Sequence, residues 1–168
     1  LVKVEACGVC YRDLIDRAGR IPFIQVPIVP GHEAAGRVVA LGPEAKQWKV
    51  GDRVGSMHRN ACGECEPCRA GHTSLCNTAA YVLGLLVDGG YARHLKMPES
   101  GFFPIPESLS GPEASVMHCT FGTAWRALVT VGGLKKGERV IVTGANGGVG
   151  AAGVQIAARF SDDVTAVV

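Results

Sequence analysis

Four cysteines fall within one 15-residue stretch, and this cluster constrains the chain more than any other feature of the sequence. Their spacing is C-x2-C-x2-C-x7-C, and the residues are Cys62, Cys65, Cys68 and Cys76. Four thiolates are the ligands of a closed tetrahedral zinc site. Gly63, Pro67 and Gly71 allow a short loop to curl until the sulfurs point inward. The cluster predicts a structural zinc lobe over residues 58–80, so the chemistry is expected elsewhere.

Two other interpretations of the cluster stay open. Disulfide bonds would require an oxidising compartment, and no secretory signal is recognised in the sequence. An iron–sulfur cluster also uses C-x2-C-x2-C, but Asn77 rather than proline follows the fourth cysteine, and the sequence has no second cluster set. Ligand type and spacing favour zinc over both.

The composition limits the class of protein. The chain has 168 residues, of which 47% are hydrophobic and 19% charged, enough for one compact core or for one domain plus part of another. The formal net charge is +2 without a run of lysines or arginines, so neither nucleic acid nor an anionic membrane is an implied partner. The apolar runs are too short to span a bilayer. We expect a cytoplasmic protein, and a fragment, because both ends lie in strand-like runs.

The first part of the sequence predicts an irregular β domain made of short strands and tight turns. After an opening strand, Cys10 is expected where the chain turns into a short helix that stops near Gly19. Cys7 and Cys10 form a C-x2-C pair, but no second pair remains to complete four ligands. Cys7 is therefore predicted to be a small buried hydrophobe. Further strands or extended segments are expected at 50–54, 90–95 and 102–106.

A composition shift near Ser110 marks a long helical stretch with Pro112 in its first turn. Within it, Cys119 taken alone is most simply a thiol that packs between helices. Trp125 is predicted to lie in the core. His58, His72 and His94 have no neighbouring acid or cysteine pattern, so they are interpreted as surface or lobe residues.

Near the end of the sequence, an apolar strand runs into a glycine-rich turn that opens a helix, and a second apolar strand follows. This context gives weight to a G-x-G-x-x-G-like pattern that is weak by itself. The turn comprises Gly144, Ala145, Asn146, Gly147, Gly148, Val149 and Gly150. The helix amino end can bind the phosphates of a dinucleotide. A P-loop is excluded because no Gly-Lys-Ser/Thr follows, while a turn that binds nothing stays an alternative.

Together, the four-cysteine lobe, Gly31-His32-Glu33, a cysteine at a helix start and the glycine turn resemble the zinc-dependent medium-chain dehydrogenase/reductase superfamily. The stretch Gly31-His32-Glu33-x2-Gly36-x5-Gly42-x2-Ala45 fits the zinc pattern of that family throughout. The resemblance implies an α/β protein. A GroES-like β-barrel catalytic domain over 1–120 would precede the truncated start of a doubly wound Rossmann domain over 121–168.

The resemblance also implies roles for individual residues. Those matching the catalytic zinc ligands are Cys10, His32 and Cys119. Asp13 matches the acid that hydrogen-bonds the histidine ligand, and Glu33 matches a glutamate close to the zinc. The lobe cysteines match a structural zinc and residues 144–150 the cofactor turn. Two zinc ions per chain, NAD or NADP, a small-molecule substrate and a homo-oligomeric full-length protein are implied.

The implied reaction is hydride transfer between a nicotinamide and an alcohol or aldehyde, with zinc polarising the substrate oxygen. One residue departs from this pattern. Arg12 stands where alcohol dehydrogenases of the family carry a serine or threonine that receives the alcohol proton, and arginine cannot accept it. The sequence around Arg12 resembles an acryloyl-CoA reductase-like branch, in which Arg12 could suit an anionic or thioester substrate. The alternatives are therefore NADPH-dependent reduction of an enoyl thioester or quinone, and a non-catalytic family member.

Overall fold

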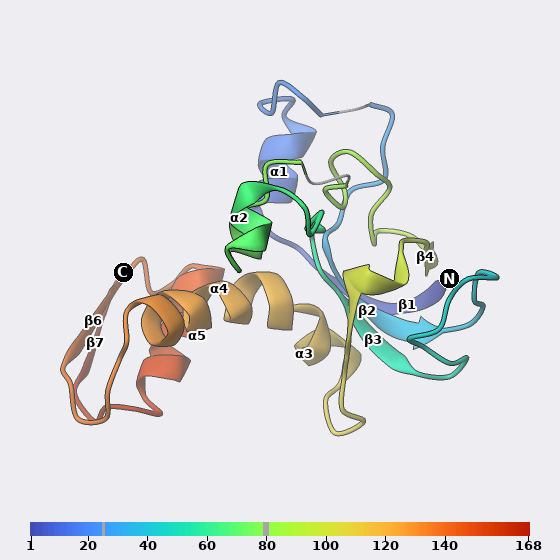
Figure 1. The fold of residues 1–168 in the computed structure, drawn as a ribbon. Coiled ribbons are helices and arrows are strands. Elements are labelled where there is room, and N and C mark those ends of the chain that lie inside the picture. Colours follow the sequence, from blue (N-terminus) through green and yellow to red (C-terminus); the bar gives the residue numbers. More distant parts are fainter. Residues whose placement is uncertain (25, 79–80) are drawn as a thin grey trace. The chain divides into compact units, whose positions relative to one another are not determined.

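The computed structural model describes residues 1–24, 26–78 and 81–168, which form two compact units, Leu1–Val116 and Met117–Val168 (Figure 1). Ala79 and Ala80, the last two residues of the expected zinc lobe, lie outside the described residues, as does Gln25. The boundary expected after residue 120 falls inside the helix Met117–Phe121, whereas the second unit begins at the start of that helix. Cys119 therefore belongs to the second unit.

In the described part of the first unit, five strands form one antiparallel sheet in the order β4-β1-β2-β3-β5. Their bounds are Val2–Gly8 for β1, Glu33–Val38 for β2, Arg53–Ser56 for β3, His94–Leu95 for β4 and Phe102–Pro104 for β5. The strand predicted over 90–95 is therefore confirmed only for its last two residues. The reason is that the backbone N–H groups of Gly89, Gly90 and Tyr91 donate instead to Val29, Gly31 and Pro30.

Both faces of this sheet are covered, as the alternation of side chains along β2 shows. Ala34 packs into the main core, whereas Ala35 packs on the opposite face with Ile105 and Ala114. The main core consists of Val2, Ala34, Val38, Val54, Leu83, Leu95 and Phe102. Cys7 packs against this core, and burial raises the pKa of its thiol to about 11. Cys7 was predicted to be a small buried hydrophobe; its packing against the core is confirmed, but its side chain is only partly buried.

The helices of the first unit are short. The α-helices are α1 (Tyr11–Arg17), α2 (Glu66–Arg69) and α3 (Gly111–Ser115), and the 3-10 helices are η1 (Thr73–Leu75) and η2 (Glu99–Gly101). Helix α3 begins as the sequence predicts, with Pro112 in its first turn. The Ser110 backbone N–H donates to a Glu113 carboxylate oxygen at 2.8 Å, and the Glu113 N–H donates to the Ser110 hydroxyl at 3.4 Å. This reciprocal cap fixes the start of α3.

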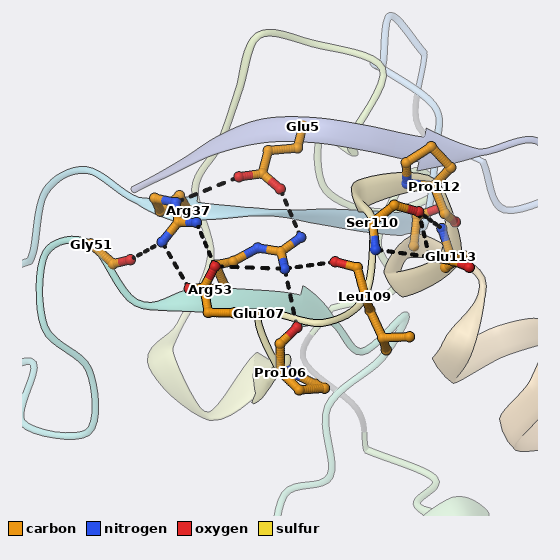
Figure 2. A network of polar contacts seen from close by, with 11 residues as sticks. Glu5, Arg37, Gly51, Arg53, Pro106, Glu107, Leu109, Ser110, Pro112 and Glu113 are labelled. Carbon is orange, nitrogen blue, oxygen red and sulfur yellow. Dashed lines mark hydrogen bonds and ion pairs between the residues drawn. The ribbon is translucent and has the colours of Figure 1, made fainter.

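A buried arginine fastens the segment before α3 to the sheet (Figure 2). The Arg53 side chain, 6% exposed, donates to the backbone carbonyls of Pro106 at 3.1 Å and Leu109 at 2.7 Å and to the Glu5 carboxylate at 3.1 Å. Arg37 lies beside it, 42% exposed, and pairs with Glu107 at 3.1 Å. The two arginines thus make similar ion pairs at different depths.

We expect Arg53→Met to lower the free energy of unfolding by about 2–4 kcal/mol, because it removes a buried guanidinium that bonds two backbone carbonyls and Glu5, and it leaves Glu5 only a longer contact with Arg37 at 3.6 Å. The matched variant Arg37→Met removes an exposed pair and should cost less than about 1 kcal/mol. Urea unfolding of both variants measures the difference. Equal decreases in the free energy of unfolding would show that the burial of Arg53 does not increase its contribution to stability.

The second unit begins with helical segments and continues as a parallel β-α-β unit. The π-helices are η3 (Met117–Phe121) and η4 (Arg126–Val131), with helix α4 (Gly122–Trp125) between them; β6 (Val140–Thr143), α5 (Gly148–Ala157) and β7 (Val164–Val167) follow. Strands β6 and β7 pair in parallel, in register from Val140↔Val164 to Thr143↔Val167. The predicted strand, glycine turn, helix and strand are confirmed. Among the described residues, no helix is both long and apolar enough to cross a bilayer.

The prediction that Trp125 lies in the core is wrong. Its side chain is 50% exposed, and its ring contacts Phe160 edge-on with centroids 6.1 Å apart. The small residue Ala124, one position earlier on the helix, takes the buried place and packs against Ala152 and Ile156 of α5. Close packing of α4 on α5 therefore leaves the indole at the rim of this core.

Candidate metal and dinucleotide sites

The four cysteines of the lobe converge as the spacing predicts. All four sulfur atoms lie within 4.8 Å of one another, and the pairs Cys62–Cys68 and Cys65–Cys76 are each 3.9 Å apart. Sulfurs around a tetrahedral zinc with bonds of about 2.3 Å are about 3.8 Å apart, so the observed spacing fits one shared ion. All seven cysteines of the chain are free thiols in the structure. The geometry supports a metal lobe rather than a disulfide framework.

Backbone amides prepare these sulfurs for a cation. The N–H groups of Cys65 and Glu64 donate to Cys62 Sγ at 3.2 and 3.4 Å. The Thr78 hydroxyl and these two N–H groups lower the pKa of the Cys62 thiol to about 6. Desolvation raises the pKa of Cys68 to about 12. Four thiolates at such close quarters require a bound cation to offset their mutual repulsion.

A second cluster of donor atoms lies at the start of α1 and β2. The donor atoms of Cys10, His32 and Glu33 all lie within 4.8 Å of one another. His32 is 1% exposed and Glu33 2%, whereas Cys10 is half-buried. The resemblance predicts these residues at a catalytic zinc, and the first unit brings the three together. A thiolate and an imidazole are ligands that zinc prefers.

Asp13 holds the His32 ring in one orientation. His32 Nδ1 lies 3.1 Å from Asp13 Oδ1, while the Tyr91 hydroxyl and the Cys10 backbone N–H donate to Asp13 Oδ2 at 2.8 and 2.9 Å. Burial works to raise the pKa of Asp13, but the hydrogen bonds from His32, Tyr91 and Cys10 lower it to about 2. The ionised carboxylate can only accept, so an imidazole proton sits on Nδ1, and in the neutral ring this leaves the lone pair on Nε2. This is the tautomer in which Nε2 can bind a metal.

A glycine is required directly before His32. Gly31 has φ +93°, a left-handed conformation that other residues rarely adopt. A Cβ atom there would lie 2.7 Å from Tyr91 Cδ1 and 2.9 Å from the Tyr91 backbone nitrogen. The close approach of Tyr91 to Gly31 is what brings its hydroxyl to Asp13. The Gly-His sequence thus has a local structural cause.

Two other expected site residues are Cys119 and Arg12. Cys119 lies on η3 in the second unit, so its expected role as a ligand beside Cys10 and His32 stays a prediction. The Arg12 guanidinium donates from Nε to Asp16 Oδ2 at 3.0 Å and from Nη2 to the Leu83 carbonyl at 2.8 Å. These contacts give Arg12 partners within the protein, and they do not support the expected contact with an anionic substrate.

The glycine turn between β6 and α5 has the shape that the pattern predicts. Gly144 has φ +63°, and the Gly147 N–H donates to its carbonyl at 3.0 Å before α5 begins. A Cβ at Gly150 would lie 2.1 Å from the Gly144 carbonyl oxygen, so the helix can approach the turn only with glycine there. A cavity of about 550 Å³ borders Gly144 and Gly147–Gly150. The turn therefore offers a helix amino end beside an open space, as phosphate binding requires.

Sequence reasoning missed two neighbours of His32. The His58 ring lies edge-on to the His32 ring, with centroids 6.3 Å apart, and the Tyr91 hydroxyl, which donates to Asp13 at 2.8 Å, also lies 3.1 Å from the Gly8 carbonyl. His58 was expected at the surface or in the lobe. Neither residue belongs to a motif at fixed spacing from His32, so the sequence held no signal for them.

This combination of a small antiparallel sheet unit, two groups of residues that could hold a metal ion and a β-α-β unit with a glycine turn is typical of the class of medium-chain dehydrogenases/reductases. Residues 1–107 match the family model described as the alcohol dehydrogenase GroES-like domain. The chain belongs to this family, and so to the superfamily that includes the zinc alcohol dehydrogenases. The expected α/β fold class is confirmed.

Individual relatives agree with this assignment. The chain is 41% identical to an alcohol dehydrogenase of Geobacillus stearothermophilus and 32% identical to an acryloyl-coenzyme A reductase of Sulfurisphaera tokodaii, each over 99% of its length. It covers 49% and 50% of those two proteins. The crystal structure of an NAD-dependent alcohol dehydrogenase superposes with a TM-score of 0.90 at 36% identity, covering 98% of this chain and 48% of that one. The chain thus spans about half the length of the relatives it matches.

Proposed function

We propose that the full-length protein is a zinc-dependent, NAD(P)-linked oxidoreductase that transfers hydride between a nicotinamide and an alcohol or aldehyde. The observation that carries this proposal is the Asp13–His32 pair. A carboxylate with donors on both oxygens orients a buried imidazole toward the sulfur of Cys10. Metal-binding histidines generally have such a partner on the second ring nitrogen.

In this proposal, Cys10, His32 and Cys119 hold one zinc ion, and the lobe cysteines hold another. Two thiolates and one imidazole leave a fourth position open, which is the ligand set that the alcohol dehydrogenases themselves exemplify. A zinc ion bound there supplies a Lewis acid for a substrate oxygen. Asp13 keeps the ring of His32 in place, and the buried carboxylate of Glu33 adds negative charge beside the cation. Residues 144–150 bind the pyrophosphate of NAD or NADP.

The glycine turn yields a specific prediction. We expect Gly150→Ala to weaken NADH and NADPH binding at least about tenfold, because the added methyl group would push α5 away from the Gly144 carbonyl and misplace the phosphate-binding N–H groups. Gly153→Ala is the matched control on the same helix, since its Cβ would meet Val142 at an ordinary 3.5 Å. Fluorescence titration of the full-length protein with both cofactors measures the affinities. Unchanged binding in Gly150→Ala would remove the dinucleotide role from this turn.

A second candidate function is the reduction of an enoyl thioester with NADPH. The observation that favours it is at position 12, where the family's alcohol dehydrogenases carry a hydroxyl group and this chain carries an arginine bonded to Asp16 and Leu83. A route for the alcohol proton through a hydroxyl at this position is therefore missing. The similarity to an acryloyl-coenzyme A reductase points the same way.

A substrate panel separates the two candidates. The full-length protein is assayed with simple alcohols and aldehydes, and with acryloyl- and crotonyl-CoA, in the presence and absence of a zinc chelator. Chelator-sensitive oxidation of alcohols or reduction of aldehydes supports the first candidate. Turnover of the CoA thioesters without any aldehyde activity replaces it with the second. Silence with every substrate, despite bound zinc, would favour a non-catalytic family member.

A further inference from the structure

Helix α1 carries Cys10 at its start and Asp13 in its first turn, yet it is only seven residues long. An isolated helix of this length is unstable in water, so tertiary contacts must hold it in place. Its buried side is formed by Asp13 and Asp16, whereas Leu14 is 51% exposed and Tyr11 72% exposed. Because apolar burial on α1 is limited, its position depends strongly on the polar contacts of the buried side.

Arg12 joins the buried side of α1 to a residue far away in the sequence. Its bond to Asp16 joins a side chain that is 23% exposed to one that is 1% exposed. An arginine four residues before an aspartate is the weaker order for a helical ion pair, so helix propensity alone does not explain this arrangement. The same guanidinium donates to the carbonyl of Leu83, a residue with 0% exposure in the main core. Arg12 thus ties α1 to a rigid part of the first unit.

Leu83 belongs to a segment that leaves the base of the cysteine lobe; we name residues 81–91 the lobe-exit segment. The Leu83 N–H donates to the His58 carbonyl at 2.8 Å, and the Tyr81 N–H donates to the Asn60 side chain at 3.0 Å. Val82 forms a bridge with Arg59. This end of the segment is therefore fixed to the residues that precede the first lobe cysteine.

The other end of the lobe-exit segment reaches the His32 site. The Gly90 N–H donates to the Gly31 carbonyl at 2.8 Å, and the Tyr91 N–H donates to the Pro30 carbonyl at 3.1 Å. The Tyr91 hydroxyl donates to Asp13. One continuous segment thus contacts the lobe base, the backbone before His32 and the acid that orients His32. Helix α1 is attached to this segment at two points, by Arg12 at Leu83 and by Asp13 at Tyr91.

We propose that Arg12 is a positioning residue that fastens α1 to the lobe-exit segment and thereby keeps Cys10 and Asp13 in place around His32. Arg12 acts through Asp16 and Leu83 and does not touch the substrate. The proposal rests on the proposed function only in that it takes Cys10 and His32 as metal ligands.

The test uses the full-length, zinc-loaded protein and three variants. Arg12→Met removes all donors, Arg12→Lys keeps the charge beside Asp16 without the two-pronged geometry, and Arg17→Met is the matched control at an exposed position of the same helix. The measurements are the rate at which a chelator removes each zinc ion and the amide hydrogen exchange of residues 10–17. The zinc ion of the lobe serves as the internal reference for intact folding.

We expect Arg12→Met to speed loss of one zinc ion about tenfold and to speed exchange across α1. This is the lower end of the effect of removing a direct partner of a metal ligand, because Arg12 acts through the helix and not on a ligand itself. Arg12→Lys should lie between Arg12→Met and wild type, and Arg17→Met should match wild type. Equal behaviour of Arg12→Met and Arg17→Met would overturn the proposal. So would a raised KM for CoA thioesters with unchanged zinc release, because Arg12 would then contact substrate. If the wild-type protein binds no zinc at His32, the proposed function fails. The positioning role is then tested by hydrogen exchange alone: exchange across α1 should be faster in Arg12→Met than in Arg17→Met, and equal rates would overturn it.

Discussion

Replacing His32 by alanine is expected to remove one of two zinc ions per chain and to lower kcat/KM at least about a thousandfold. His32 is 1% exposed and held in one orientation by Asp13, and its replacement removes the only imidazole of the Cys10–His32–Glu33 donor cluster among the described residues. Losing a metal that stabilises developing charge costs several kcal/mol, and about 4 kcal/mol corresponds to a thousandfold in rate. Metal analysis and steady-state kinetics of the same preparation measure both effects.

Two further variants serve as comparisons for His32→Ala. Asp13→Asn keeps the histidine ligand and weakens its orientation, so we expect kcat/KM to fall about 10- to 100-fold. His94→Ala removes an exposed histidine on β4 and should leave zinc content and turnover as in wild type. If His32→Ala kept both zinc ions and more than a tenth of wild-type activity, the assignment of His32 as a ligand would be wrong.

Replacing a buried lobe cysteine is expected to have the largest effect on stability. Cys68→Ser removes one of four sulfurs from a lobe whose described elements, α2 and η1, contribute no residue to the hydrophobic core clusters. Metal binding supplies the folding free energy of such segments. We expect loss of the lobe zinc and a fall in Tm of roughly 10 °C or more, which corresponds to about 4 kcal/mol for a chain of this size. Thermal unfolding followed by circular dichroism and metal analysis measure both.

Cys7→Ala is the matched control for this variant. Cys7 is partly buried against the main core and belongs to neither group of ligand residues. Its loss removes packing only, at a cost of about 1 kcal/mol, and the zinc content should not change. A fall in Tm as small in Cys68→Ser as in Cys7→Ala would show that the lobe holds no structural metal.

Features encoded by short-range spacing could be predicted from the sequence. The lobe cysteines follow one another within a single loop, so their spacing alone brought the sulfurs together. The glycine turn lies between a strand and a helix that are adjacent in the chain, and the structure has both. The cap of α3 depends on Ser110 and Glu113, three positions apart. In each case the residues that make the structure lie close together in sequence.

Contacts between distant residues could not be predicted. Tyr91 reaches Asp13 across 78 positions and Arg12 reaches Leu83 across 71, and no repeating pattern links either pair. The placement of Tyr91 depends on backbone bonds to residues 29–31, which also ended the strand predicted over 90–95. The Asp13–His32 pair was expected only through the family resemblance. The interpretation of Arg12 differs from the one based on sequence, because its partners Asp16 and Leu83 are seen only in the folded structure.

Anomalous diffraction at the zinc edge, from crystals of the full-length protein, can locate each metal ion directly. We predict two zinc ions per chain, one bonded to the four lobe sulfurs and one bonded to Cys10 Sγ, His32 Nε2 and Cys119 Sγ with a further coordination position open. A single zinc ion in the lobe, with no metal on His32, would contradict this prediction.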